Sequence, residues 1–473
     1  MRWTFFRHAL SWIALLACAA SARATVLTLD EVLESVRRHY PPLIAALQEM
    51  EVADGQVLQA EGRFDVTARA RVDTNQLGFY SDRRVDVGIE QPTAWGGTSY
   101  FTGWRVGDGL FPSYDGKFLT RDLGEYRTGI RLPLFRDRVV DTRRAELQRA
   151  QLGRRIADLS IDQQRLLVRL GATRRYWEWV AAGRRYVLAL AILETARARD
   201  QQLRDAVALG QLPAIEVADN NRAILARRAQ AVEAERFLQM AAIELSLFYR
   251  DDQGNPVVPA DDRLPPALPD PASISHLQLE RDIANALNLR PEISAIGIQK
   301  HQTQVEIDLA RNETLPNIDL VVGFTREFGQ GPVLRGPSEL RGSVVFELPF
   351  QRRVARGRLQ TARARLNQLD QRERFAQDQV AAEVKDALSA VRTAYERAAV
   401  LREEVEVTRQ LEDAERTRFD LGDSNLFILN LREQATFEAA VRELGALVDY
   451  QRAYASYEFS VAEALNVSGR SGP

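Results

Sequence analysis

The sequence predicts a mostly α-helical fold with a smaller β part, built twice from one plan. Three observations predict it: a long internal repeat, short segments of alternating polarity, and two segments of about 70 residues without proline. Equivalent helix-like stretches open at Pro41 and Pro291, and equivalent strand-like stretches end at Pro133 and Pro349. A repeat of this length sets the order of elements in both halves before any single residue is considered.

Composition narrows the class of protein. The chain has 473 residues, of which 45% are hydrophobic, and a formal net charge of -2. A chain of this length can bury a large core and has room for two or more domains. Because no strong basic field is present, we expect no nucleic-acid partner.

Residues 1–24 have the pattern of a signal peptide. Arg2 and Arg7 supply positive charge, residues 9–20 are apolar, and residues 22–24 (Ala-Arg-Ala) form a small-x-small cleavage site. No later stretch holds 18 consecutive apolar residues, so we expect no transmembrane helix after the signal.

Cleavage at this site would start the mature chain at Thr25 and remove Cys18, the only cysteine. The mature protein would then hold no disulfide and no cysteine-based metal site. An alternative stays open, because residues 15–18 (Leu-Leu-Ala-Cys) resemble a lipoprotein signal, which would lipidate Cys18 instead. A short tether from Cys18 to the first helix argues against it, since about ten residues reach at most roughly 35 Å.

Strict alternation of apolar and polar residues predicts strands. Residues 64–73 alternate without a break and would give one apolar and one polar face. In a soluble sheet the apolar face would meet a core, whereas in an outer-membrane barrel it would meet lipid, and the alternation alone allows both. The other strand candidates are 85–90, 98–106, 126–132, 318–326 and 342–348.

The two copies differ in length within this strand region. Pro41 and Pro291 are 250 residues apart, but Pro133 and Pro349 are 216 apart, so the first copy holds 34 extra residues. These residues form either a hairpin or an enlarged loop. We expect the segment from about Val85 to Asp115 to lie at or outside the membrane and to tolerate shortening.

Helical periodicity is strongest in the long proline-free segments. Residues 137–208 carry apolar residues at steps of three and four, typical of a coiled coil, and would extend roughly 105 Å as one helix. Trp177 and Trp179 lie in this pattern and are expected to pack between helices. A first helix is expected from Thr28, with Glu31 at capping-box spacing, to about Glu61.

Proline-rich sequence separates the copies, and the segment from Tyr249 to Pro271 must be irregular. A short helix is expected from about Ile274 to Leu289. The predicted organisation is a signal peptide (1–24), a first repeat (25–249), a Pro-rich linker (250–273), a second repeat (274–467) and a disordered tail (468–473).

Four short stretches carry a family resemblance through their order and duplication. They are residues 290–293 (Arg-Pro-Glu-Ile) with the following Ala-rich helix, 312–316 (Asn-Glu-Thr-Leu-Pro), 348–350 (Leu-Pro-Phe) and 419–424 (Phe-Asp-Leu-Gly-Asp-Ser). In this arrangement the chain resembles the TolC-like outer-membrane efflux proteins, the outer membrane factors of tripartite pumps. The resemblance covers nearly all of the expected mature chain.

The resemblance implies a homotrimer in the outer membrane, with a long periplasmic extension. Three protomers would share one β-barrel, continuous with a long coiled-coil α-helical barrel, and each would usually contribute four strands. The implied function is a passive exit duct of an efflux or type I secretion system. The implied partners are outer-membrane lipid, a periplasmic adaptor and an inner-membrane transporter.

A second class of protein stays open, namely a periplasmic coiled-coil scaffold or adaptor that never enters the membrane. Aromatic residues around the strands favour the membrane class, because barrels carry aromatic girdles at the two membrane interfaces. These residues are Trp95, Tyr100, Trp104, Phe111 and Tyr114. An enzyme is not expected: the histidines are scattered, and no catalytic, cofactor-binding or metal-binding constellation stands out.

Functional residues are expected where the long helices reverse. Gly210 and Gly422 fall at these reversals, since glycine adopts the positive φ that such a cap needs, and Pro213 follows the first. Glu216 and Asp219 are three residues apart on one helix face. In a trimer they would form carboxylate rings that favour cations; alternatively they are a solvated helix start.

The second copy departs from the family here. The family often places gate carboxylates in this region, but the chain has Phe427, Ile428 and Leu429 instead. Asp420 and Asp423 are the nearest acidic residues and are the remaining gate candidates of that copy.

Overall fold

The computed structural model describes residues 25–273, 278–331 and 338–463. The expected signal peptide with Cys18, the tail 468–473 and Ile274, the expected start of the short helix, lie outside these residues.

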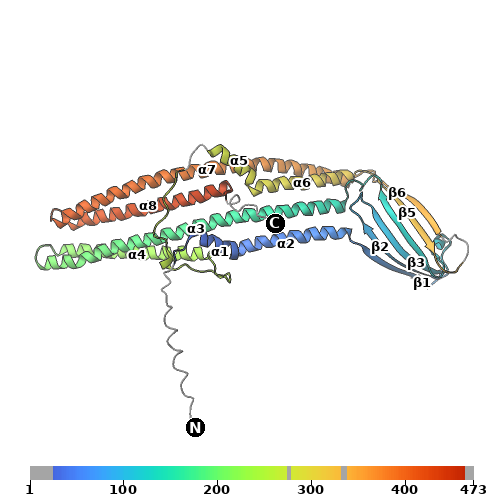
Figure 1. Cartoon of the computed structure of the whole chain (residues 1–473), viewed down its shortest axis with the longest axis horizontal. Helices are drawn as coiled ribbons and strands as arrows, with labels where there is room; N and C mark the ends of the chain where they lie inside the picture. Colours follow the sequence, from blue (N-terminus) through green and yellow to red (C-terminus); the bar gives the residue numbers. More distant parts are fainter. Residues whose placement is uncertain (1–24, 274–277, 332–337, 464–473) are drawn as a thin grey trace, which may run out of the picture. The chain divides into compact units, whose positions relative to one another are not determined.

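Helices and strands follow one another in the same order in both halves (Figure 1). The helices are α1 (Leu29–His39), α2 (Pro41–Glu61), α3 (Thr142–Ala208), α4 (Ile215–Ser246), α5 (Leu279–Leu289), α6 (Pro291–Asn312), α7 (Arg353–Asp420) and α8 (Leu426–Ser460). The strands are β1 (Thr67–Asn75), β2 (Asp82–Pro92), β3 (Ser99–Gly109), β4 (Glu125–Pro133), β5 (Asn317–Glu327) and β6 (Ser338–Glu347).

The internal duplication appears in matched elements. Helices α2 and α6 both begin at a proline, where the absent N–H costs nothing. Helices α3 and α7 contain 67 and 68 residues, and each is followed by a shorter return helix. The chain forms two compact units, and each takes segments from both halves. The helical unit holds the residues up to Ala45, Gln164–Leu289 and those from Val380; the strand-bearing unit holds Ala46–Gln163 and Arg290–Gln379.

The first helix differs from the prediction, because it is two helices that meet at Tyr40. Tyr40 has φ −78° and ψ 114°, an extended conformation that its neighbour Pro41 imposes sterically. Thr28 caps α1 as expected, accepting the Glu31 N–H at 3.2 Å. The Glu31 carboxylate does not complete a capping box; it accepts from Tyr249 and Arg263 at 2.8 and 2.7 Å.

The six strands form one antiparallel sheet in the order β1-β2-β3-β4-β5-β6. Strand β1 begins later than predicted, at Thr67, because residues 62–64 form a 3-10 turn. The extra residues of the first copy are a hairpin: β2 and β3 pair with each other, and lie between β1 and β4. The expectation that the segment from about Val85 to Asp115 can be shortened without loss of assembly is therefore wrong for its strand residues, because they belong to two internal strands of the sheet.

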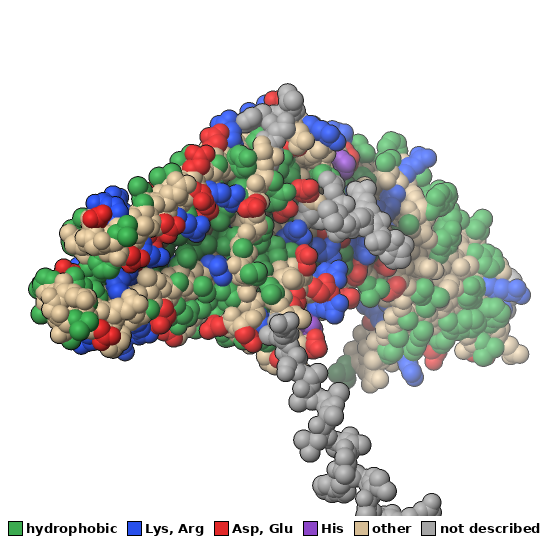
Figure 2. Space-filling model, turned by 60° about the vertical axis from the view of Figure 1, so that its left-hand side comes forward, with side chains coloured by type: hydrophobic (Ala, Val, Ile, Leu, Met, Phe, Trp, Pro, Cys, Tyr) green, Lys and Arg blue, Asp and Glu red, His purple; other side chains and the backbone are tan. Residues whose placement is uncertain are grey.

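The register gives the sheet two different faces. On the first face, Val72, Val85 and Val106 are aligned on neighbouring strands. The register carries this face on to Leu340 and Val344 of β6, which are 78% and 65% exposed. Hydrophobic side chains crowd over the strand region (Figure 2). This face is called the apolar face below.

Charged side chains pair across the strands on the opposite side, called the polar face below. Arg105 contacts Glu125 at 2.5 Å, and Arg127 contacts Asp86 at 2.5 Å. Arg84 forms a further pair with Asp73 on the neighbouring strands. Opposite charges at facing positions stabilise a register, since a slip of one residue would move every charge to the apolar face.

Four helices join the sheet at one end of its strands. Strands β1 and β5 begin after α2 and α6, and β4 and β6 end before α3 and α7 (Figure 1). Ion pairs link neighbouring helices near this junction. Arg149 of α3 contacts Glu306 of α6 at 3.1 Å, and Lys300 of α6 contacts Asp370 and Glu373 of α7 at 2.8 Å each.

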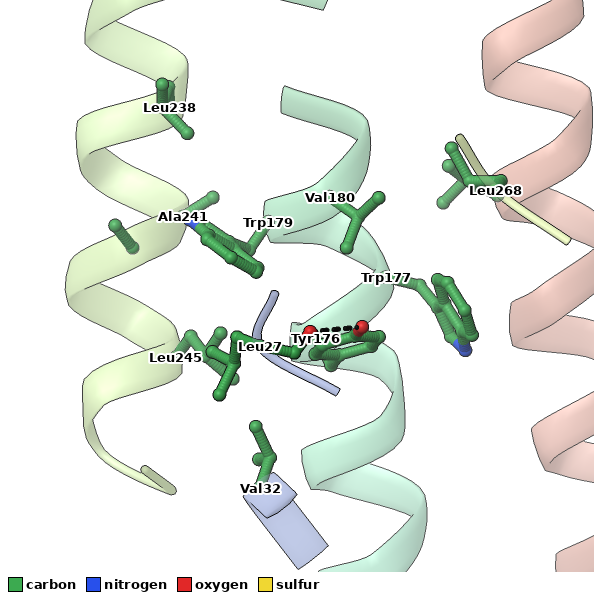
Figure 3. Packing of buried hydrophobic residues seen from close by; sticks show 12 residues of the cluster. Leu27, Val32, Tyr176, Trp177, Trp179, Val180, Leu238, Ala241, Leu245 and Leu268 are labelled. Atoms are coloured by element: carbon green, nitrogen blue, oxygen red, sulfur yellow. Dashed lines mark hydrogen bonds between the residues drawn. The ribbon is translucent and has the colours of Figure 1, made fainter. Parts of the chain in front are cut away.

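The helical unit has its largest core around α3 and α4 (Figure 3). Trp179 is fully buried against α4, and Trp177 is nearly so, which confirms their predicted packing role. The Tyr176 hydroxyl donates to the Leu27 carbonyl at 2.8 Å and so fixes the segment that enters α1. Burial raises the pKa of Tyr176 to about 12, so the phenol stays a donor at neutral pH.

We predict that Tyr176→Phe destabilises the helical unit by about 1–2 kcal/mol, because the buried Leu27 carbonyl loses its donor. Thermal unfolding of the purified protein, followed by circular dichroism, measures the effect. Tyr114→Phe is the matched control, since Tyr114 is 78% exposed. Equal melting temperatures for both variants would contradict the prediction.

Candidate functional site

Both long helices reverse at a glycine, as the sequence predicts. Gly210 has φ +71° and Gly422 has φ +81°, the left-handed region that favours glycine. The Gly210 N–H donates to the Val207 carbonyl and the Gly422 N–H to the Phe419 carbonyl, both at 3.0 Å. The two helix ends, each with its turn and the start of the return helix, are called the tips below.

Glu216 and Asp219 lie at the start of α4, within the first tip. Both are half-buried, and the Glu216 N–H donates to the carbonyl of Pro213 at 3.1 Å. Asp219 contacts Arg222 at 3.8 Å, a solvent-accessible pair within one helical turn, and such a pair contributes little stability. The two acids therefore sit where the positive end of the helix dipole favours a negative charge.

Asp420 and Asp423 lie in the second tip, on either side of Gly422, and are both exposed. Asp420 is the last residue of α7, and the Asp423 N–H donates to the Arg418 carbonyl at 2.8 Å. Asn425, not an acid, caps α8 by accepting the Ile428 N–H at 3.0 Å. Asp420 and Asp423 are thus free of a capping role at α8.

A buried charge cluster that sequence reasoning missed lies behind the tips. Glu433 of α8 is only 3% exposed and contacts Arg199 of α3 and Arg227 of α4, the latter at 2.7 Å. Asn430 accepts from both arginines, at 3.2 and 3.3 Å. Arg416 of α7 approaches Glu433 at 3.4 Å. Side chains of all four helices therefore meet at one carboxylate, called the Glu433 cluster below.

Electrostatics keep this carboxylate ionised. Burial raises the pKa of Glu433, but Arg199 and Arg227 lower it by more, so its pKa lies below that of an ordinary glutamate. The Arg227 guanidinium also donates to the Ile192 carbonyl at 3.0 Å, which satisfies more of its buried hydrogens. A buried charge without such partners would be costly.

The sequence does contain a signal for this cluster. Arg199 follows Ile192 and Ala196 at heptad spacing, and all three are buried in α3. Glu433 likewise follows the buried Leu426 and Leu429 in α8. A charged residue at a core position of a coiled coil indicates that a neighbouring helix supplies a polar or charged partner, although the sequence does not identify that partner.

Neither a metal site nor a helical membrane span emerges from the described part of the chain. Residues 25–273, 278–331 and 338–463 contain no group of three or more His, Cys, Asp or Glu placed to hold a metal ion. Over the same ranges, no helix combines the length and the apolar composition needed to cross a membrane.

The comparisons agree with this architecture. Residues 283–465 match the family described as outer membrane efflux protein. No curated protein matches the chain by sequence. The resemblance to the TolC-like outer-membrane efflux proteins is confirmed: residues 283–465 match the family's sequence pattern, and 93% of the chain shares the fold of an outer-membrane channel.

Several solved structures share this fold at low sequence identity. The outer-membrane channel OprN is 16% identical, with 93% of each chain covered and a TM-score of 0.64. The Campylobacter jejuni CmeC outer membrane channel is 14% identical, with 93% of this chain and 89% of that chain covered and a TM-score of 0.63. The Neisseria gonorrhoeae MtrE outer membrane channel is 17% identical, with 92% and 88% covered and a TM-score of 0.62.

We predict that Glu433→Gln destabilises the helical unit by roughly 3 kcal/mol, because it leaves Arg199 and Arg227 buried without a counter-charge. The matched control is Glu438→Gln, an exposed position on the same helix. Thermal unfolding at neutral pH measures both, and a loss no larger than that of the control would contradict the prediction.

We predict that the stability difference between wild type and Glu433→Gln depends on pH. Because the folded-state pKa of Glu433 is lowered, its stabilisation is present above the ordinary value of 4.5 and is lost as the pH falls through the folded-state pKa. The difference in melting temperature between wild type and Glu433→Gln should therefore shrink as the pH falls below 4.5 and through the folded-state pKa of Glu433.

Proposed function

We propose that the chain is one protomer of an outer-membrane efflux channel, a passive duct from the periplasm to the outside. The observation that carries the proposal is the sheet with an exposed apolar face and an ion-paired polar face, joined to long coiled-coil helices. In a membrane barrel the apolar face meets lipid and the polar face lines water.

Closure of such a barrel requires further copies of the chain. Strands β1 and β6 are the edges of the sheet, and every residue of β6 is exposed. Unpaired backbone groups cannot lie in a bilayer, so each β6 would pair with β1 of the next copy. Six strands from each of three copies would close a barrel of eighteen strands, instead of the twelve implied by four per protomer.

The helices support the same assembly. Helix α4 carries an apolar stripe that is exposed in one copy, at Leu225, Val232 and Ile243. Helix α7 carries a second exposed stripe, at Val400 and Val407, with heptad spacing. Since exposed stripes of this kind pack against partner helices, the two would join neighbouring copies into an α-helical barrel in the periplasm.

Docking of a periplasmic adaptor is assigned to the tips. Leu209 and Leu421 are 73% and 74% exposed beside the two tip glycines, an apolar arrangement suited to a protein partner. The adaptor would connect the duct to an inner-membrane transporter, which supplies the energy. The chain itself would perform no catalysis.

The alternative of a periplasmic scaffold outside the membrane is disfavoured by the apolar face. Phe346 (62% exposed), Leu340 and Val344 would all face water in a soluble protein. Trp104, Tyr126 and Phe328 gather at the end of the strands remote from the helices, with ring centroids 6.5 and 5.2 Å from Trp104. An aromatic group at that level fits a membrane interface.

The trimer is tested by mass and by cross-linking. We expect the protein extracted from outer membranes in detergent to have the native mass of three chains. A cysteine on β1 and a cysteine on β6 should form a disulfide between chains. As the control, a cysteine on β2 and a cysteine on β6 should form none, because β2 lies inside the sheet. A stable water-soluble monomer would overturn the proposal.

The gate is assigned to the tip carboxylates, with Glu216 and Asp219 as the principal residues and Asp420 and Asp423 beside them. Threefold symmetry would bring three copies of each carboxylate together, and such rings favour cations. The combined Glu216→Gln and Asp219→Asn variant should lower cation selectivity and weaken block by multivalent cations in planar bilayers. A Glu233→Gln and Glu235→Gln variant, further along α4, is the matched control. Unchanged selectivity and block in the tip variant would return Glu216 and Asp219 to a solvated helix start.

A further inference from the structure

The loop between β3 and β4 folds back against the sheet instead of extending away from it. It spans Leu110–Gly124 and includes a 3-10 turn at Ser113–Phe118. Thr120 is buried and binds Gly107 of β3 twice: its hydroxyl accepts the Gly107 N–H at 3.0 Å, and its own N–H donates to the Gly107 carbonyl at 3.0 Å. The loop is therefore anchored along the strand that precedes it.

The absence of a side chain at Gly107 makes this anchoring possible. A Cβ at that position would lie 1.9 Å from the carbonyl oxygen of Phe118, far inside contact distance. The backbone of the loop thus occupies the space that a side chain of β3 would fill.

Phe118 is the second anchor. Its ring lies under the guanidinium of Arg84, 4.3 Å from the ring centroid, and near that of Arg105, at 5.2 Å. Arg105 also donates to the Lys117 carbonyl at 3.4 Å. Cation–π contacts of this kind are stronger where water is excluded, and both arginines are largely buried here.

The register identifies which face the loop covers. Arg84 stands opposite Gly107 in the pairing of β2 with β3, and Arg105 is two residues before Gly107 on the same side. Arg84 and Arg105 both belong to the polar face, since they form its ion pairs with Asp73 and Glu125. The loop therefore lies over the polar face, at the end of the strands remote from the helices.

We propose that Leu110–Gly124 is an inward-folded constriction that sets the size limit of hydrophilic solutes at the outer mouth of the channel. The inference rests on the proposed function, in which the polar face lines the lumen. Barrel diameter grows roughly in proportion to strand number, so eighteen strands give a lumen roughly one and a half times as wide as twelve. Three inward loops would narrow this wider mouth.

Side chains at the turn of the loop point to the same role. Tyr114 is 78% exposed and Lys117 is exposed, although the loop backbone behind them is held at Gly107. In a trimer Tyr114 would project toward the axis from this fixed support, with the Lys117 ammonium beside it, 5.1 Å from the Phe118 ring centroid. Their tyrosine hydroxyls and ammonium groups suit polar or anionic solutes.

Thiol labelling from outside intact cells tests the constriction. Ser343→Cys places a thiol on the polar face at mid-strand, opposite Val321. A small charged methanethiosulfonate should label it, whereas a maleimide carried on polyethylene glycol should label it slowly. Replacing 111–119 by Gly-Ser-Gly should speed labelling by the large reagent and leave labelling by the small reagent unchanged. Phe118→Ala keeps the loop length but removes the contacts of the ring with Arg84, Arg105 and Lys117, and should raise the large-reagent rate roughly tenfold.

Two controls separate the possible failures. Val344→Cys lies on the apolar face and should react with neither reagent. The proposed function is wrong if Val344→Cys reacts as fast as Ser343→Cys. It is also wrong if the small reagent does not label Ser343→Cys. Phe79→Ala removes an 82% exposed ring from the β1–β2 turn and should leave both rates unchanged. If the large reagent labels Ser343→Cys equally fast with the native, shortened and Phe118→Ala loops, the lumen is not constricted there and the inference is overturned.

Discussion

The period of two along the strands is the constraint on which the structure depends. It places valine, leucine and aromatic side chains on one face and cross-strand ion pairs such as Arg105 with Glu125 on the other. The apolar face is unfavourable in water, and the charged face is unfavourable in an apolar environment, so the two faces need different surroundings. An environment that is apolar on one side and aqueous on the other resolves this conflict, and the proposed membrane barrel would provide it.

The helical unit solves a different problem, which is how four long helices with similar surfaces find one arrangement. Alanine is the most frequent buried residue of this unit, as at Ala189, Ala234 and Ala439, and such small side chains distinguish poorly between registers. The Glu433 cluster interrupts this uniform packing with a charge that only correctly placed Arg199 and Arg227 can satisfy. Such a cluster gives specificity more than net stability, because desolvation offsets much of the attraction.

The asymmetry between the two halves is confined to the sheet. Helices α3 and α7 differ by one residue in length, whereas the first half has two more strands than the second. Long coiled-coil helices must keep their heptad register with every neighbour, but a hairpin can enter a sheet without disturbing the helices at the other end of its strands. The first half also carries the loop between β3 and β4, which covers the polar face. The additional hairpin would therefore widen the proposed barrel, and the loop that follows it would narrow the lumen.

The sequence by itself determined the elements that local physics controls. Periodicity gave the long helices, alternation located all six strands, and glycine marked both helix reversals, because these signals act over a few neighbouring residues. It also determined the family resemblance, which rests on the order of those elements. Only the tertiary structure decided that 82–109 is an internal hairpin, that Arg199, Arg227 and Glu433 meet, and that Phe118 lies against Arg84. These contacts join residues that are far apart along the chain, and each residue has many compatible partners, so spacing cannot select among them.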